Sequence, residues 1–552
     1  MPELMRSRTR VAGVALVCAQ ALIPLVFDHD ADWAFVVPKA LLGHTLALAS
    51  AALLVALVLR FGRAALVWSP LHVGALSFLA ACVIATVFAM DPYIALFGTH
   101  ERMIGLTTIA QWVVLYFSLV TFVRTRRDAI AVASCALVGS LGVLLYEVVQ
   151  VTGRDPYVWT IEGTDRAFST TGQPTSLAQY TSTVAVAAFA AAILAPTIGR
   201  RLRLALLVLA AANIWGTAAT DSRAPVVGIA AAAFFLVIVI WLARRGTRDA
   251  RVAAFSGVAA VVALAALFAF TPIGARVAFT IQATGEADLF SRVDESTAGR
   301  FALYGIAIGE FLERPLVGYG PDNFVLGVAR YRQAAAPPAV RQSAATSAHS
   351  WLVQTLATTG LLGTLALLAT LVVAGVLLVR SRFAPVPLIA AAALVADLGT
   401  GITTIDDLSS GWIAWFCLGV IAASTGTPVP AAAQATPARR KGGRRPVARE
   451  PQWRRVAAGA VIVAGVLAMV TAMTAYGASR AAKASSDARM TGKAAERWTR
   501  PASRPTHPSR SSWAPPTFSM VSAAHLVCPL RVLPALCGVS GTSPAASPPC
   551  SP

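Results

Sequence analysis

Apolar runs of about twenty residues recur along almost the whole chain, and they limit its fold more than any motif does. A helix needs about that length to cross the hydrocarbon core of a bilayer, where it satisfies its own backbone groups. With 56% hydrophobic and 13% charged residues over 552 positions, the chain is too apolar for a soluble globule. The sequence therefore predicts an all-α, polytopic membrane helix bundle of about 12–13 transmembrane helices. The predicted spans are 11–27, 40–59, 71–90, 104–123, 129–149, 176–194, 204–220, 224–243, 252–271, 351–379, 384–402, 411–424 and 456–478.

Arginine-rich loops alternate with acidic or mixed loops between these spans. Arg6, Arg8 and Arg10 precede the first span, which we interpret as a retained helix because no small-residue cleavage site follows it. The positive-inside rule places arginine-rich loops in the cytoplasm, so the N-terminus is predicted to be cytoplasmic and the long loop 272–350 extracytoplasmic. Much of the formal charge of +20 then lies at the anionic inner leaflet, and it does not indicate nucleic-acid binding.

Composition divides the chain into four parts. A membrane body, 1–424, contains the polar extracytoplasmic loop 272–350, and a basic cytoplasmic linker follows at 425–455. One more transmembrane helix is predicted at 456–478. The extracytoplasmic tail, 479–552, becomes rich in proline, serine and threonine, which is typical of a disordered or truncated terminus. The sequence contains no HExxH motif and no closely spaced cysteine pair, so no metal or other cofactor is expected.

Three extracytoplasmic segments carry polar residues that a passive scaffold would not need. The first is TAATDSRAPVVG, where Arg223 lies in a short loop between two spans. One interpretation is that this arginine only extends to interfacial water. The other is that the short loop holds it near the bilayer surface, where a lipid-linked anion would lie.

The second segment is STAGRFALYGIAIGEFLERPLVGYGPDNF. A cap at Ser296 or Thr297 predicts a helix that ends near Glu313, before a proline and a Gly-Tyr-Gly turn. Arg300 and Tyr304 then share one face of this helix. The alternative is an interfacial helix that lies flat on the membrane, with its arginine on lipid phosphate.

The third segment is SAHSWLVQ, in which His349 immediately precedes a long apolar helix. A single histidine in a loop is more often solvated or structural than catalytic. Its position is nevertheless informative, because the predicted topology places it at the same membrane surface as Arg223 and Arg300.

Taken in order, these segments resemble a known family. GTHERMIGL, TTGQPTSLAQY, DSRAP, STAGRFALYGIAIGEFLERPLVGYGPDNF and SAHSWLVQTLATTGLLG are similar to the O-antigen ligase and O-antigen polymerase superfamily of bacterial envelopes. The resemblance covers most of residues 1–424 and is strongest from Ser296 to Gly363. It departs at Gly172–Thr175, where members of the family commonly have Asn-Pro-Asn or a similar sequence.

The resemblance implies a glycosyltransferase C-like fold and a metal-independent, inverting transferase or ligase. Such an enzyme moves a glycan from a polyprenyl diphosphate carrier, such as undecaprenyl diphosphate, to a glycan, lipid or protein acceptor. The reaction would take place at the outer face of the bacterial cytoplasmic (inner) membrane. O-antigen polymerase and protein O-oligosaccharyltransferase activities are alternatives, and a bicarbonate-like solute transporter is an alternative from another class.

The resemblance also implies roles for individual residues. Arginines would hold the diphosphate, and a histidine would assist the acceptor hydroxyl. Guanidinium groups form bidentate, charge-assisted hydrogen bonds with phosphate, and a neutral histidine can accept a proton near pH 7. The predicted catalytic residues are His349 and Arg300. The predicted substrate-binding residues are Arg223, Arg300, Arg102, Gln173, Tyr304 and Arg314.

Overall fold

The computed structural model describes residues 2–62, 66–159, 166–196, 198–243, 295–331, 345–404, 406–428, 473–474 and 476–486. The predicted span at 252–271 and most of the one at 456–478 lie outside these residues. The chain divides into two compact units, residues 1–491 and 492–552, and every described residue belongs to the first. Residues 476–486 are helical, and this helix includes the beginning of the segment expected to be a disordered tail.

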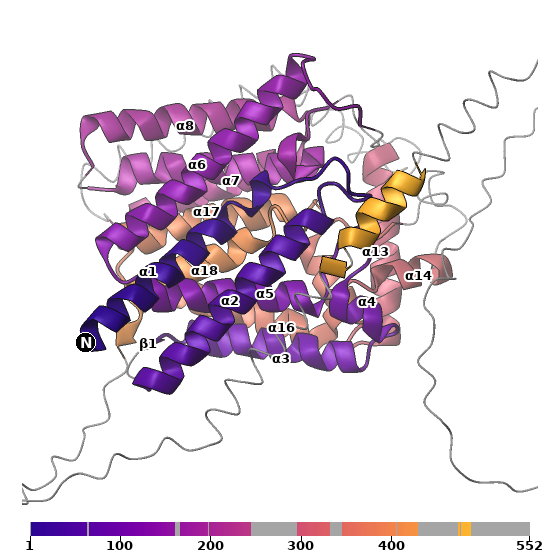
Figure 1. Cartoon of the computed structure of the whole chain (residues 1–552), viewed down its shortest axis with the longest axis horizontal. Coiled ribbons are helices and arrows are strands. Elements are labelled where there is room, and N and C mark those ends of the chain that lie inside the picture. Colours follow the sequence, from indigo (N-terminus) through magenta and orange to yellow (C-terminus); the bar gives the residue numbers. More distant parts are fainter. Residues whose placement is uncertain are drawn as a thin grey trace, which may run out of the picture. The chain divides into compact units, whose positions relative to one another are not determined.

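Almost all the regular structure in the described residues is helical, as Figure 1 shows. The strands in this part of the chain are β1 (Val67–Trp68) and β2 (Thr427–Pro428), which pair antiparallel. The all-α fold predicted from the sequence is therefore confirmed. The helices are α1 (Pro2–Ala21), η1 (Ile23–Leu25), α2 (Val37–Phe61), α3 (Leu71–Val87), α4 (Pro92–Phe97), α5 (Leu106–Phe122), α6 (Arg126–Val151), η3 (Ser169–Thr171), α7 (Pro174–Leu194), α8 (Arg200–Ala219), α9 (Ala224–Ala243), α13 (Glu295–Glu313), α14 (Phe324–Tyr331), α16 (Trp351–Arg380), α17 (Pro385–Gly401) and α18 (Trp412–Thr425).

Six helices in the described part of the chain are long and apolar enough to cross a membrane, namely α2, α6, α7, α8, α9 and α16. Four shorter helices, α3, α5, α17 and α18, are also apolar. Most of these helices pack against one another in pairs, including α7 with α8, α9 with α17, α3 with α16 and α5 with α18. The protein is accordingly a multi-pass membrane protein.

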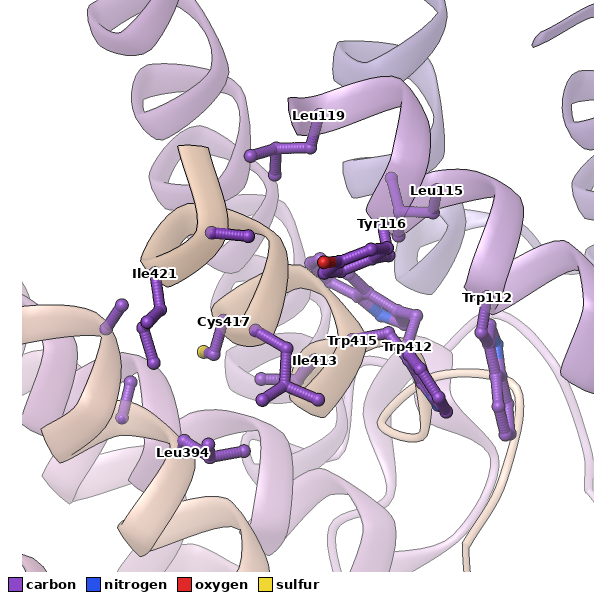
Figure 2. Close-up of a cluster of buried hydrophobic side chains, with 14 of the residues drawn as sticks. Trp112, Leu115, Tyr116, Leu119, Leu394, Trp412, Ile413, Trp415, Cys417 and Ile421 are labelled. Carbon is purple, nitrogen blue, oxygen red and sulfur yellow. The ribbon is translucent and has the colours of Figure 1, made fainter. Parts of the chain in front are cut away.

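Aromatic side chains fill the contact between α5 and α18. Trp112 and Tyr116 on α5 are buried with Trp412 and Trp415 on α18 (Figure 2). The Tyr116 and Trp415 rings lie edge to face, with centroids 6.5 Å apart, an arrangement that aromatic pairs favour. The two helices carry the loops that precede α5 and α18, so this packing fixes the position of both loops.

Glycines bring α9 and α17 into close contact. A Cβ atom added to Gly228 on α9 would lie 2.3 Å from the Ala396 carbonyl oxygen of α17, and one added to Gly399 would lie 2.8 Å from the Gly228 Cα. Small residues allow such close approach of helices in membranes. Because Gly228 is near the start of α9 and Gly399 near the end of α17, α9 begins where α17 ends. We call this end of the bundle the site end.

Helix α16 is broken at Gly360, which has φ 61° and ψ −160°. The turn that follows α13 fills the break: the Ala357 carbonyl accepts the Tyr319 N–H at 3.0 Å, and the Thr358 carbonyl accepts the Gly320 N–H at 2.8 Å. On the other side of the break, the N–H of Leu361 donates to the carbonyl of Pro315 at 2.8 Å. The sequence predicted an unbroken helix over 351–379, and that prediction was wrong about its continuity.

We expect Gly360→Ala to destabilise the protein. The backbone at Gly360 lies in a region open essentially to glycine alone, and strain of this kind costs about 1–3 kcal/mol. An added Cβ would also lie 2.5 Å from the backbone of Leu316. Thermal unfolding of the purified protein in detergent should show a lower Tm. The control is Gly375→Ala in the same helix, where a Cβ meets nothing within 4 Å. An unchanged Tm for Gly360→Ala would contradict the described break.

Candidate active site

Arg300, Tyr304 and His349 come together at the site end. Tyr304 follows Arg300 by about one turn of α13, and its hydroxyl donates to the Ile402 carbonyl, 3.3 Å away, just after α17. The same hydroxyl interacts with the Ser350 side chain and with the charge of Arg300. The charge of Arg300 also acts on His349. The structure therefore gathers the start of α16, the end of α17 and one face of α13 around these three residues.

Hydrogen bonds hold the backbone around His349 in a strained conformation. His349 has φ 54°, a value that few residues other than glycine adopt. Its N–H donates to the Ser347 hydroxyl at 3.1 Å, and the N–H of Ala348 donates to the Gln354 side chain at 2.8 Å. The indole of Trp351 donates to a carbonyl in the last turn of α17 at 3.0 Å. These contacts fix the backbone on both sides of His349.

The pKa of His349 is lowered from 6.5 to about 4. Burial is the largest cause, and the positive charges of Arg300 and then Arg102 add to it. At pH 7 the imidazole is therefore neutral, and one ring nitrogen has a lone pair that can accept a proton.

Arg223 lies in the tight turn between α8 and α9, and its carbonyl accepts the Val226 N–H at 3.1 Å. The preceding Asp221 has φ 49°. Since α9 begins where α17 ends, this turn belongs to the site end, together with Arg300 and His349. The Arg223 side chain is partly buried.

Gln173 is the N-terminal cap position of α7, and its side-chain oxygen accepts the Ser176 hydroxyl at 3.4 Å. The side chain of Lys39, which is fully buried, fixes the turn before Gln173. The Lys39 ammonium donates to the carbonyls of Thr170 at 2.7 Å and Phe35 at 2.9 Å. The Gln179 side chain, near the start of α7, donates a hydrogen bond to Asp397 near the end of α17. This contact places the first turns of α7 at the site end.

Arg314 lies just after α13, and its guanidinium donates to the Phe88 carbonyl at 2.6 Å and stacks on the Tyr319 ring. It thereby attaches the turn after α13 to the end of α3. The helix itself ends at Glu313, as predicted, and it begins one residue before the predicted cap.

Arg102 lies in the loop before α5, and its guanidinium contacts three other segments. Its Nη1 donates to the Asp322 carboxylate at 2.8 Å and to the Thr346 carbonyl at 2.9 Å, and its Nη2 donates to the Asp406 carbonyl at 3.1 Å. Asp322 also accepts the N–H and the hydroxyl of Thr99, at 2.7 and 2.9 Å. These hydrogen bonds join four loops at the site end.

Residues 205–368 match the family model described as O-antigen ligase. This part of the chain is similar to the O-antigen ligase domain. The match confirms the resemblance to the superfamily and supports a membrane glycosyltransferase of the O-antigen ligase or polymerase type. It includes Arg223, Arg300 and His349, whereas Arg102 and Gln173 lie before it. A search of the curated proteins found no match, and neither did a search of the solved structures.

Side chains from α3, α5, α7, α16, α17, α18 and the loops between them line a small, mainly apolar cavity of about 120 Å³. It is lined in part by Arg102, Asp322, Asp406, Gln179 and Asp397. A cavity of this size is well below the several hundred Å³ of ordinary ligand pockets and suits a few water molecules. It is therefore too small to hold a lipid-linked glycan.

A buried polar network near this cavity was not predicted from the sequence. The Gln179 amide of α7 donates to Asp397 of α17 at 3.0 Å, and its oxygen accepts the Thr404 hydroxyl at 2.8 Å. Both Gln179 and Asp397 are almost fully buried. The signal available in the sequence was an acid and an amide inside apolar runs, since such groups in membrane helices usually have a structural or functional partner.

Proposed function

We propose that this chain transfers a glycan from a polyprenyl diphosphate carrier to an acceptor hydroxyl. The supporting observation is the grouping of Arg300, Tyr304 and His349 at the end of α17, with the charge of Arg300 acting on a neutral His349. A cation for the leaving group and a base for the acceptor are the two groups that this reaction requires.

In the proposed reaction, the acceptor oxygen attacks the anomeric carbon as the bond from that carbon to the diphosphate breaks. The diphosphate leaves with the bonding electrons, and the configuration at the carbon inverts. Arg300 and Arg223 bind the phosphate oxygens, where a charge-assisted hydrogen bond contributes about 1.5–3 kcal/mol. Gln173 and Tyr304 lie at the same end of the bundle and are assigned to the glycan.

His349 takes the proton that the acceptor hydroxyl loses. With a pKa of about 4 the free imidazole is a weak base, whereas a general base works best with a pKa near the working pH. The diphosphate carries negative charge into the neighbourhood of Arg300, and an anion near a histidine raises its pKa. Donor binding would therefore strengthen the base at the moment when the acceptor arrives.

The arginine distribution supports an extracytoplasmic position for the site end. Helix α7 begins at the site end, so α8, the next helix, begins at the opposite end, where Arg200, Arg201 and Arg203 stand at its start. The positive-inside rule favours the cytoplasm for that arginine-rich end. The proposed location is the bacterial inner membrane, with the reaction on its outer face.

The filled break in α16 favours a transferase over a solute transporter. Transporters often use the backbone groups of broken helices to bind substrates or ions. Here the carbonyls of Ala357 and Thr358 and the N–H of Leu361 are already hydrogen-bonded to the turn 315–320. That arrangement stabilises the break and leaves these groups engaged with the protein.

The test is transfer by purified protein in liposomes that contain a fluorescent glycan on polyprenyl diphosphate, with candidate lipid, glycan and peptide acceptors supplied separately. We expect glycan to move to one acceptor class and the carrier diphosphate to be released in equal amount. The same liposomes are assayed for bicarbonate uptake. Uptake without any transfer, under conditions in which the donor binds, would contradict the proposal and favour a transporter.

A further inference from the structure

The guanidinium of Arg102 is already occupied by protein groups. Its side chain is only 8% exposed, and both Nη atoms donate to the protein, to Asp322, Thr346 and Asp406. Its Nε–H is buried and has no hydrogen-bond partner. A diphosphate could bind the two Nη atoms of this arginine only by displacing Asp322 or the carbonyls of Thr346 and Asp406. Breaking a buried ion pair is strongly unfavourable, because it leaves a charge without compensation.

Asp322 sets the direction of the Arg102 fork. The Asp322 side chain is fully buried, and its own φ is 57°, so its backbone is held by the turn in which it lies. Thr99 donates twice to the second carboxylate oxygen, which leaves the first oxygen for Arg102. Asp322 therefore holds one side of the guanidinium. The remaining hydrogen bonds of the guanidinium go to the backbone carbonyls of Thr346 and Asp406.

The contact with Thr346 links Arg102 to His349. Thr346 begins the short segment that leads to His349, whose backbone is strained at φ 54°. The 2.9 Å bond from Arg102 fixes the beginning of this segment. The bonds that the N–H groups of His349 and Ala348 donate to the side chains of Ser347 and Gln354 fix its end. Loss of the Arg102 bond would allow the segment to relax, because a strained backbone persists only where the surroundings hold it.

The charge of Arg102 reaches His349 as well. Arg300 from α13 and Arg102 from the loop before α5 act on His349 through their charges. Tyr304 interacts with the neighbouring Ser350, and Gln354 accepts the N–H of the neighbouring Ala348. The carboxyl groups of Glu101, Asp322 and Asp406 lie around Arg102. Among these residues, Arg300 and Arg102 are the cations that lower the His349 pKa.

We propose that Arg102 is a positioning residue for His349: it fixes the loop that carries this histidine through the Thr346 carbonyl, and it does not bind the donor. The proposal rests on the function proposed above and assigns Arg102 a different role from Arg300. Asp322 and Thr99 belong to the same arrangement, since they orient the guanidinium.

The experiment compares Arg102→Gln, Arg102→Lys and the milder Thr99→Val in the full chain, with Arg330→Gln as the control. The Arg330 side chain on α14 is 61% exposed and pairs with Glu313 of α13 at 2.9 Å. Four quantities are measured for each: the Kd for a fluorescent polyprenyl diphosphate glycan, kcat and KM for transfer, and the pH midpoint of His349. The midpoint comes from NMR of histidine-labelled protein, with the signal assigned by its loss in His349→Gln.

For Arg102→Gln we expect kcat to fall by about 100-fold, the effect of a small misplacement of a catalytic group, while the donor Kd stays within about two-fold of the wild type. The His349 midpoint should rise, because a nearby positive charge is removed and the loop is more open to water. Arg102→Lys should retain the low midpoint but still lose kcat, since lysine keeps the charge and lacks the planar fork. Thr99→Val should lower kcat by less.

A donor Kd that weakens in Arg102→Gln as much as in Arg300→Gln would overturn the proposal and make Arg102 a donor ligand. An unchanged kcat and His349 midpoint in both Arg102→Gln and Thr99→Val would overturn it too. If the wild type transfers no glycan, the function proposed above fails by itself. The NMR midpoints then still decide the positioning role, because they need no activity. Should Arg102→Gln not fold, kcat and the donor Kd are compared in Arg102→Lys and Thr99→Val, where kcat should fall and the donor Kd should stay within about two-fold of the wild type.

Discussion

Replacing His349 with glutamine is expected to lower kcat for glycan transfer by about 10²–10⁴-fold, the usual contribution of a general base. Glutamine is similar in size and keeps a polar end, but it cannot accept the proton of the acceptor hydroxyl. Because the proposed role of His349 concerns the acceptor, the Kd for the lipid-linked donor should change little. Single-turnover transfer by the variant in liposomes, together with donor binding, measures both quantities.

The control is His29→Gln, since His29 lies in the loop after α1 and its ring stacks on Tyr157, with ring centroids 4.7 Å apart. It should transfer glycan at the wild-type rate. A His349→Gln protein that is folded and fully active would remove this histidine from the mechanism. Recovery of activity in His349→Lys or His349→Arg would instead indicate that the imidazole acts as a cation on phosphate.

Replacing Arg300 with glutamine is expected to lower kcat/KM for transfer by about 10²–10³-fold, similar to the removal of one group that stabilises developing negative charge. Donor binding should weaken as well, because the diphosphate is already anionic before the reaction. Arg300→Lys should recover part of the activity through its charge and not all of it, since lysine lacks the planar fork that matches phosphate. Titration with the fluorescent donor and initial rates of transfer provide the two readouts.

Arg330→Gln again serves as the control, because its side chain is 61% exposed and pairs with Glu313. Arg300→Gln should also raise the pH midpoint of His349, since burial and the charge of Arg300 are the first two causes of its low pKa. Wild-type donor affinity in Arg300→Gln would mean that the diphosphate binds elsewhere.

Much of the fold follows from local properties of the sequence. The lengths of the apolar runs predict the positions of the helices, and Pro315 predicts the end of α13 at Glu313. The break in α16 was missed because a glycine in a run such as LATTGLLGTL is compatible with a continuous membrane helix. What stabilises the break is the turn at Gly318 and Gly320, which comes from a segment distant in the sequence. Periodicity contains no information about such a pairing.

The candidate site could be predicted only in part, for a similar reason. The order of the motifs and the predicted topology placed Arg300 and His349 at the same membrane surface. The structure places both residues at the same end of the bundle. The sequence also suggested Arg102 as a substrate-binding residue, but its partner Asp322 lies in a different loop. Whether an arginine faces a ligand or a buried carboxylate depends on tertiary contacts, and these are not encoded in the spacing of either motif.

The central claim is that one polyprenyl diphosphate binds beside Arg300 with its sugar facing His349. The most direct measurement is an electron cryomicroscopy structure of the His349→Gln protein in lipid nanodiscs, with the intact lipid-linked glycan bound. We predict phosphate density in hydrogen-bonding contact with the Arg300 guanidinium and the anomeric carbon next to residue 349, at the end of α17. Donor density at the opposite end of the bundle, or phosphates bound away from Arg300, would contradict this account.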